Sequence, residues 1–228
     1  MSDTATPALA AISWSAGKDS CLALLRARES GLHVGTFLTM LDPDGLSKSH
    51  ALPPELIAAQ VAALGGRWQP AVAGPGDYAA VFAAQLEALR ASGHTHLVFG
   101  DIDLQAHRDW LEPACARAGL AAVFPLWGEA RAAVAQEVIA RGIRAVLVCV
   151  DTRWLDASFC GADYDAALLA RLPAGVCPCG EGGEFHTFVR DAPGFAQPLH
   201  LRRAGQRTVA SRPPLSPTVL VFQDLAPA

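Results

Sequence analysis

Four side chains of a short polar loop, residues 13–20, could together bind a phosphate group. Ser15 and Ser20 supply hydroxyl donors, and Lys18 supplies a positive charge. The loop follows an apolar run and precedes a helical pattern, so backbone N–H groups and the positive end of the helix would point at one place. Asp19 would repel a phosphate unless a divalent cation lay between them. The loop therefore predicts a phosphate site that also takes Mg²⁺, which Asp19 would contact together with the phosphates.

A second polar segment, residues 177–187, has the sequence CPCGEGGEFHT. Glu181 and Glu184 stand three residues apart among glycines, which allow the backbone to approach a ligand closely. His186 follows the second of these carboxylates. The segment is therefore expected to contact one ligand through more than one polar side chain.

These segments belong to a chain in which short apolar runs alternate with helical patterns. The runs are continuous rather than alternating, as is typical of strands buried on both faces of a parallel sheet. We therefore expect an α/β fold in which right-handed connections place helices on both faces of the sheet. One helical pattern, residues 105–118, contains Pro113 and is expected to break or kink there. The expected strands are residues 8–12, 33–40, 68–73, 96–99, 121–124 and 145–150.

Polar residues follow several of these strands. Ligands of open parallel sheets bind beyond the carboxyl ends of the strands. The phosphate loop follows the first strand, His50 lies after the second, Gly100 and Asp101 follow the fourth, and Asp151 follows the sixth. An acid beside a strand can also cap a helix, so capping and function both stay open for Asp101. Together these residues fit a nucleotide with its metal.

The character of the chain changes near residue 151. The part that follows is partly helical in pattern, then rich in Gly and Cys, and ends in short strand candidates separated by turn-like residues. We expect a larger α/β domain over residues 1–150 and a smaller C-terminal α+β domain over residues 151–228. The strand candidates, which could form an antiparallel set, are residues 197–202, 207–212 and 218–222.

Composition disfavours several classes of protein. The chain has 228 residues, of which 51% are apolar, so it can bury a substantial core. No apolar run approaches the ~20 residues that cross a bilayer, and no secretion signal is recognisable, so we expect a cytoplasmic protein without a membrane partner. Eighteen Lys and Arg against 22 Asp and Glu give a net charge of −4. Because the basic residues do not cluster, no nucleic-acid partner is expected.

The six cysteines are scattered and are expected to be reduced thiols. Cys177 and Cys179 could bind zinc with His186, but a closed zinc site needs four ligands and no second pair stands nearby. Cys21 begins a helical pattern, where a thiolate nucleophile would be favoured. Packing inside that helix is the alternative, and it suits the neighbouring leucines better.

Two segments resemble motifs of a known family. SAGKDS, residues 15–20, is similar to the S-G-G-x-D-S loop of ATP pyrophosphatases, with Ala16 where that pattern has glycine. GEGGEFHTF is similar to the G-E-[NG]-G-E-[FY]-H-T signature of the diphthine-ammonia ligase family, and GDIDLQAHRDWLE resembles its middle segment. The resemblance extends from about residue 12 to about residue 195. Ala16 would be strained if its position needs a positive φ.

The resemblance implies a HUP, Rossmann-like nucleotide-binding domain, a smaller C-terminal domain and a cleft between them. It also implies a reaction in which ATP adenylates a carboxylate and ammonium then amidates it, releasing pyrophosphate and AMP. ATP and Mg²⁺ would be required. The residues expected to hold the nucleotide are Ser13, Ser15, Ala16, Gly17, Lys18, Asp19, Ser20, His50, Gly100 and Asp101. Those expected to act on the reacting groups are Lys18, Asp19, Glu181, Glu184 and His186.

Two other functions stay open at this point. Related loops serve tRNA thiolation, and a sulfur transferase of that kind would need Cys177 or Cys179. The nucleotide fold also occurs in non-catalytic adenine nucleotide-binding proteins. The family's acyl substrate, diphthine on an elongation factor, is absent from bacteria, whereas the lysine-poor, alanine-rich composition suggests a GC-rich bacterium. A small-molecule carboxylate would then replace diphthine, and a homodimer is compatible with the sequence.

Overall fold

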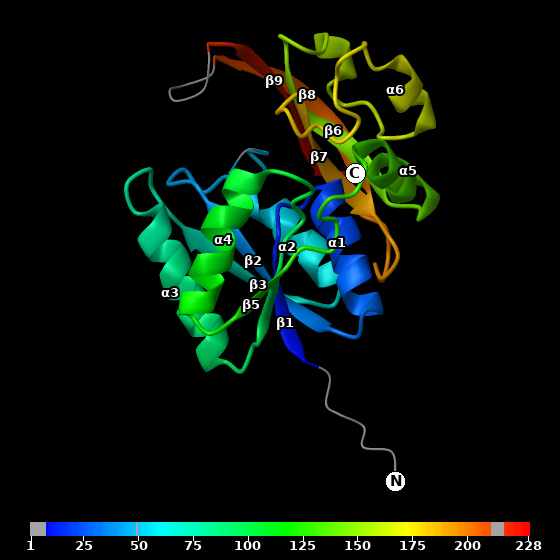
Figure 1. Ribbon diagram of the computed structural model, residues 1–228. Coiled ribbons are helices and arrows are strands. Elements are labelled where there is room, and N and C mark those ends of the chain that lie inside the picture. The colour runs from blue at the N-terminus through cyan, green and yellow to red at the C-terminus, as the bar shows by residue number, and fades with distance from the viewer. Residues whose placement is uncertain (1–7, 49, 211–216) are drawn as a thin grey trace.

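The computed structural model describes residues 8–48, 50–210 and 217–228. Two β-sheets form its framework, and helices pack around them (Figure 1). The last two residues of the predicted strand 207–212 lie outside the described residues. Within the described ranges, no helix combines the length and the apolar character needed to span a membrane.

The first sheet has five parallel strands in the order β3-β2-β1-β4-β5. In the central strand, Ile12 pairs with Phe37 of β2 and with Val98 of β4. The strand order reverses between β1 and β4, which is where parallel sheets open a crevice for ligands. The predicted parallel α/β sheet is confirmed. Its strands are β1 (Leu9–Ser13), β2 (His33–Leu41), β3 (Arg67–Val72), β4 (His96–Val98) and β5 (Ala121–Val123).

Helices cover both faces of this sheet, as the sequence predicted (Figure 1). Strand β1 shows why, because Ala10 and Ile12 face one buried core while Ala11 between them faces the other. Helices α1 and α2 contribute to the first core, and α3 and α4 contribute to the second. Helix α4 continues through Pro113, so the predicted break of the helix at this residue is wrong. The bounds are α1 (Lys18–Glu29), α2 (Pro54–Ala63), α3 (Tyr78–Ala91) and α4 (Gln105–Arg117).

The second sheet is antiparallel, with the order β7-β6-β9-β8. Helices α5 (Arg131–Ala140) and α6 (Ala166–Arg171) and the short 3₁₀ turn Ala157–Phe159 accompany it. The predicted smaller α+β part is therefore confirmed, although its division from the first at residue 150 stays a prediction. The strands are β6 (Arg144–Asp151), β7 (Phe185–Asp191), β8 (Leu201–Ala210) and β9 (Val219–Pro227).

Two strand predictions in this region are wrong. Strand β6 was expected as the sixth strand of the parallel sheet, but it pairs antiparallel with β7 and β9. Its residues after Arg144 are all buried, and burial on both faces produces the same continuous apolar run in either kind of sheet. The separate strands expected at 197–202 and 207–212 correspond to the single long strand β8, whose pairing with β9 shifts register near Gly205.

The second sheet shares a core with the first. Val146 and Phe188 of the second sheet belong to the same buried cluster as Leu22 of α1. Buried polar contacts reinforce this packing at Gln60 of α2. Its Oε1 atom accepts a hydrogen bond from the Trp14 indole at 2.7 Å, and its amide nitrogen donates to the carbonyls of Ala16 and Val189. Because that side chain is fully buried, it ties the loop after β1 to β7 without competition from water.

Replacing Gln60 with leucine should therefore lower the free energy of unfolding by about 2–4 kcal/mol, because the buried Trp14 N–H and the carbonyls of Ala16 and Val189 each lose the hydrogen bond with Gln60. Denaturant titration followed by tryptophan fluorescence measures this loss. Gln105→Leu is the matched control, since that side chain is exposed on α4 and donates to Asp109, and it should change stability by less than about 0.5 kcal/mol. Equal losses of unfolding free energy in the two variants would contradict a stabilising role for the Gln60 hydrogen bonds.

Candidate functional site

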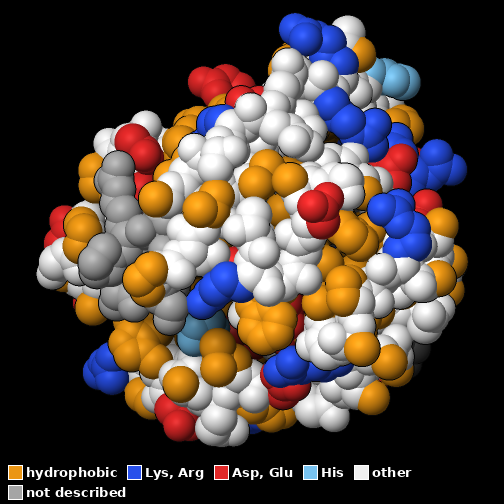
Figure 2. All heavy atoms as spheres, turned by 90° about the horizontal axis from the view of Figure 1, so that it is seen from above, with side chains coloured by type: hydrophobic (Ala, Val, Ile, Leu, Met, Phe, Trp, Pro, Cys, Tyr) orange, Lys and Arg blue, Asp and Glu red, His pale blue; other side chains and the backbone are white. Residues whose placement is uncertain are grey.

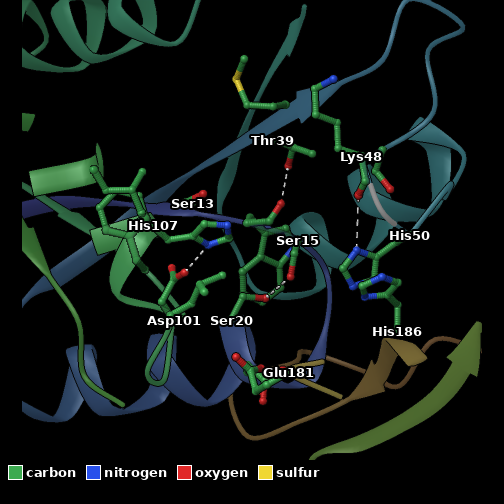
Figure 3. Close-up of a pocket in the computed structure, with 18 of the residues that line it drawn as sticks. Ser13, Ser15, Ser20, Thr39, Lys48, His50, Asp101, His107, Glu181 and His186 are labelled. Atoms are coloured by element: carbon green, nitrogen blue, oxygen red, sulfur yellow. Dashed lines mark hydrogen bonds and ion pairs between the residues drawn. The ribbon is translucent and has the colours of Figure 1, made fainter. Parts of the chain in front are cut away.

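A cavity of about 980 Å³ opens at the carboxyl ends of β1, β2 and β4 and is bordered on its other side by the loop that precedes β7. Figure 2 shows a recess in this face with a histidine side chain lying deep inside it. Figure 3 shows polar side chains from both sheets directed toward the same space. The predicted residues that line the cavity are Ser13, Ser15, Lys18, Asp19, Ser20, His50, Gly100, Asp101, Glu181 and His186.

The loop after β1 presents unused donors to this cavity. Gly17 is the N-cap of helix α1, and the backbone N–H groups of Asp19 and Ser20 have no protein acceptor among the described residues. The hydroxyl groups of Ser15 and Ser20 lie 3.1 Å apart at the same helix end. Free N–H groups at the positive end of a helix, joined by two hydroxyls, are a donor set suited to phosphate oxygens.

Gly100 explains how β4 comes so close to this helix end. A β-carbon at this position would lie 2.8 Å from the Ser20 amide nitrogen. Only a glycine therefore lets the end of β4 contact the first turn of α1. The next residue, Asp101, lines the cavity and accepts a hydrogen bond from the imidazole of His107.

Ala16 has a φ of +68° and is fully buried. Its backbone carbonyl oxygen makes the polar contacts of this residue. This oxygen accepts hydrogen bonds from the backbone N–H of Val189 at 3.0 Å and from the Gln60 amide. The left-handed conformation is favourable for glycine and strained for other residues. The structure thus explains why the resembling motif has glycine here and shows that this chain holds an alanine in the same strained backbone. The Ala16 side chain does not line the cavity.

Lys18 is engaged by the protein itself. Its ammonium group donates to the Asp19 carboxylate at 2.7 Å and to the Cys179 carbonyl at 2.5 Å, and it lies over the rings of Tyr164 and Phe185. Burial is the largest single cause and acts to lower the pKa of Lys18, but the nearby acidic groups, with Asp19 first among them, together outweigh it and the net shift is upward. The side chain is 2% exposed. The ammonium group of Lys18, which the sequence predicted to bind phosphate, therefore connects α1 to the loop before β7 in this structure.

The loop before β7 turns its two carboxylates in opposite directions. Glu184 is buried, accepts hydrogen bonds from the N–H groups of Cys177 and Gly182, and does not line the cavity. A β-carbon on Gly182 would lie 2.8 Å from the Glu184 carboxylate, so glycine is needed for this turn. Glu184 thus differs from the prediction that it faces the reacting groups, because it serves as an internal acceptor that shapes the loop.

Glu181 is the carboxylate of this loop that faces the cavity. It is half-buried and has no hydrogen-bond partner among the described residues. Burial first, and then the nearby charge of Asp19, raise the pKa of Glu181 to about 7. A carboxylate with this pKa can accept and release a proton near neutrality.

His50 and His186 meet at another wall of the cavity, with ring centroids 4.6 Å apart. Burial is the main cause that lowers the pKa of His186 to about 4, and burial also lowers the pKa of His50 well below its ordinary value. Both rings are therefore uncharged at neutral pH. A β-carbon on Gly17 would lie 3.2 Å from His50, so the glycine leaves room for this ring although it does not itself line the cavity.

All six cysteines are free, as the sequence predicted, and the structure shows that all are buried. Burial raises the pKa of Cys21 to about 12, which leaves the thiol inert and agrees with its packing inside α1. Cys177 differs, because a hydrogen bond from Cys179, with a contribution from the guanidinium of Arg131, lowers its pKa to about 5. No group of three or more metal-ligating side chains forms among the described residues.

Aromatic side chains also line the cavity, and the sequence patterns did not single them out. Phe82 and Trp110 have ring centroids 5.2 Å apart, and Tyr78 lies 5.8 Å from Trp110. A signal for this wall of the cavity was present in α4, where residues 104, 107 and 110 are spaced so that they lie on one face of a helix. A cavity lined by both aromatic rings and phosphate donors suits a nucleotide, which has an apolar base and charged phosphates.

A parallel sheet with a polar loop and a cavity at its switch point is the arrangement of PP-loop α/β proteins. Residues 8–122 match the family model of the diphthamide synthase N-terminal domain, and residues 131–210 match that of the diphthamide synthase C-terminal domain. The chain belongs to the diphthamide synthase family. This confirms the resemblance to diphthine-ammonia ligases that its motifs indicated.

One similar solved structure is the predicted subunit of a tRNA methyltransferase from Methanocaldococcus jannaschii. It is 15% identical in sequence, the alignment covers 81% of this chain and 98% of that one, and the TM-score is 0.46. No curated protein matches the chain.

The strain at Ala16 can be measured by comparing two alanine-to-glycine variants. Ala16→Gly and Ala10→Gly both remove a fully buried methyl group and add backbone freedom, but only Ala16 has a positive φ. Ala16→Gly should therefore leave the protein more stable than Ala10→Gly by about 1–2 kcal/mol, the cost of a left-handed residue with a β-carbon. Denaturant unfolding measures both values, and equal stabilities would show that the loop is unstrained.

Proposed function

We propose that the protein is an ATP-dependent ligase that joins a carboxylate to ammonium and releases AMP and pyrophosphate. The observation that carries this proposal is the presence of two unlike groups in one cavity. Free N–H donors at the start of α1 suit phosphate oxygens, and the unpartnered Glu181 carboxylate suits a cation such as ammonium. Family membership supports the same reaction class.

The donor set of the loop fits the phosphates of ATP. Ser15, Ser20 and the N–H groups at the helix start would hold the β- and γ-phosphates. Asp19 lines the cavity as the carboxylate of this loop, so Mg²⁺ would be held by Asp19 together with phosphate oxygens, an arrangement usual for this ion. When bound, Mg²⁺ would neutralise part of the phosphate charge. The aromatic side chains that line the cavity would take the adenine base.

The chemistry needs two displacements. An oxygen of the substrate carboxylate forms a bond to the α-phosphorus while the bond from that phosphorus to the bridging oxygen breaks, so pyrophosphate leaves. Ammonia then forms a bond to the acyl carbon, and AMP leaves with the electron pair of the broken acyl–oxygen bond. Ammonium must lose a proton before it can attack, and a second proton is released as the amide forms. The protein therefore has to provide a base beside the acyl carbon.

Among the three predicted candidates, Glu181 is best suited to be this base. Glu184 is occupied by backbone N–H groups outside the cavity. The lowered pKa of His186 makes it a weak proton acceptor at neutral pH. Glu181 faces the cavity, and its raised pKa of about 7 matches the proton transfer.

Product analysis tests the reaction class. A screen of candidate carboxylates with ATP, Mg²⁺ and ammonium should find one that stimulates release of AMP and pyrophosphate together. The stimulated rate should fall by at least about 100-fold in Asp19→Asn, because the metal-binding charge is lost. Formation of ADP and phosphate would contradict the proposal. A pyrophosphate release rate that Asp19→Asn leaves unchanged would instead favour a non-catalytic nucleotide-binding protein.

The role of Glu181 predicts a pH profile. Because the base must be ionised, the amidation rate should rise with pH through a midpoint of about 7 and level off above it. Glu181→Gln should lower kcat with ammonium by about 10²–10⁴-fold. Hydroxylamine is already unprotonated at neutral pH, so it should restore most of the lost rate when it replaces ammonium.

Glu184→Gln is the matched comparison for this variant. It should reduce the free energy of unfolding by about 1–3 kcal/mol, because an amide replaces an acceptor of two backbone N–H groups. Hydroxylamine should not rescue it. Rescue of Glu184→Gln, or a wild-type profile without a rise near pH 7, would contradict the assignment to Glu181.

Sulfur transfer to tRNA is the alternative that one observation favours, namely the lowered pKa of Cys177. Its thiol does not line the cavity, whereas Cys179 does, and the Cys179 thiol donates to the Arg131 carbonyl. The double variant Cys177→Ser with Cys179→Ser separates the two functions. Retained pyrophosphate release and amide formation would count against sulfur transfer. The expected cytoplasmic location and homodimer stay predictions.

A further inference from the structure

The proposed ligase mechanism leaves one charged pair in the cavity without a role. His107 belongs to the first turn of α4, and its Nδ1 atom lies 2.8 Å from the Asp101 carboxylate. Asp101 directly follows Gly100, which touches the first turn of α1, so the pair stands next to the phosphate loop. Figure 3 shows the His107 ring directed into the cavity and joined to Asp101 by this bond.

The surroundings of His107 favour its charged form. The hydrogen bond to Asp101 is the largest cause that raises the pKa of His107, and the negative charges of Asp101 and Glu181 add to it. The phenol of Tyr78 also feels the Asp101 charge. With Nδ1–H donated to Asp101, the Nε2 atom has no protein partner among the described residues. When protonated, the ring therefore presents one N–H donor and a positive charge to the cavity.

The other cations that line the cavity are already bound by protein groups. Lys18 is held by Asp19 and the Cys179 carbonyl. Lys48 forms an ion pair with Asp42 and lies over the ring of Tyr78. His107 has one ring nitrogen bound and the other exposed to the cavity, and its side chain is 61% exposed. It is thus the lining cation whose donor is most available to a ligand.

We infer that His107, oriented by Asp101, binds a phosphate oxygen of the nucleotide, either the α-phosphate that stays on AMP or the pyrophosphate that leaves. This inference rests on the proposed function in that it needs a phosphorylated ligand in the cavity. His107 would donate Nε2–H to the oxygen and place its charge there. Asp101 is a positioning residue, because it fixes the ring and sustains the imidazolium.

Binding measurements separate the two phosphates without the acyl substrate. Isothermal titration of the full chain with AMP and, separately, with inorganic pyrophosphate and MgCl₂ gives the affinity for each. At pH 6, His107→Gln should weaken one of the two by about tenfold, the value of one charge-assisted hydrogen bond. At pH 9 the wild type and His107→Gln should bind that ligand with equal affinity, because the imidazolium is deprotonated. The variant should melt within about 2 °C of the wild type because the side chain is exposed.

Two further variants make the test specific. His33→Gln is the matched control, since His33 is exposed and does not line the cavity, and it should leave both affinities unchanged. Asp101→Asn should move the pH at which the advantage disappears to a lower value, because the carboxylate no longer supports the charge of His107. A role of Asp101 confined to folding would leave that pH unmoved.

The outcomes distinguish this inference from the proposed function. Weaker binding of pyrophosphate alone places His107 at the leaving group, and weaker binding of AMP alone places it at the α-phosphate. Equal affinities of wild type and His107→Gln for both ligands at pH 6 would overturn the inference while leaving the ligase proposal intact. Failure of both ligands to bind the wild type would overturn the two together.

Discussion

The buried hydrogen bonds at the Ala16 carbonyl hold the phosphate loop and the second sheet in one structure. This oxygen accepts from the Val189 backbone and from Gln60, while Gln60 also bonds Trp14 and the Val189 carbonyl. The left-handed backbone of Ala16 aims the carbonyl at β7, so local strain is offset by contacts with the second sheet. A cavity built from both sheets depends on this tie, because its donors come from one side and Glu181 from the other.

Glycines decide which polar groups reach the cavity. At Gly100 the missing side chain lets β4 touch α1, and at Gly182 it leaves space for the Glu184 carboxylate to turn inward. Gly183 has a φ of +81°, which allows the chain to reverse between the two glutamates. Two carboxylates three residues apart thereby acquire different roles, one shaping the loop and one facing the ligand. Their environments, rather than their residue type, set this difference.

Sequence patterns predicted the parallel sheet well because its short strands alternate with amphipathic helices. They also placed the loop of residues 13–20 at the carboxyl end of the first strand, where the structure has it lining the cavity. They failed where the partner of a strand is chosen by distant residues, as for β6, whose apolar run fits either sheet. The carboxylate pair of the glycine-rich segment was identified, but the inward turn of Glu184 depends on backbone N–H groups whose positions no spacing reveals. His107 was inside a recognised motif, yet its link to Asp101 appears only when α4 folds against the end of β4.

The ion pair between Lys18 and Asp19 affects how the cavity can bind charged ligands. Asp19 and Glu181 both face the cavity, and their repulsion is one cause of the raised pKa of Glu181. Lys18 neutralises Asp19 in this structure, so a metal ion that took over the Asp19 carboxylate would free the ammonium or leave it with the Cys179 carbonyl alone. Phosphate and metal would then have to arrive together, since either one alone meets an unbalanced charge. Binding of the nucleotide would thus be coupled to the loop before β7, which carries both Cys179 and the proposed base.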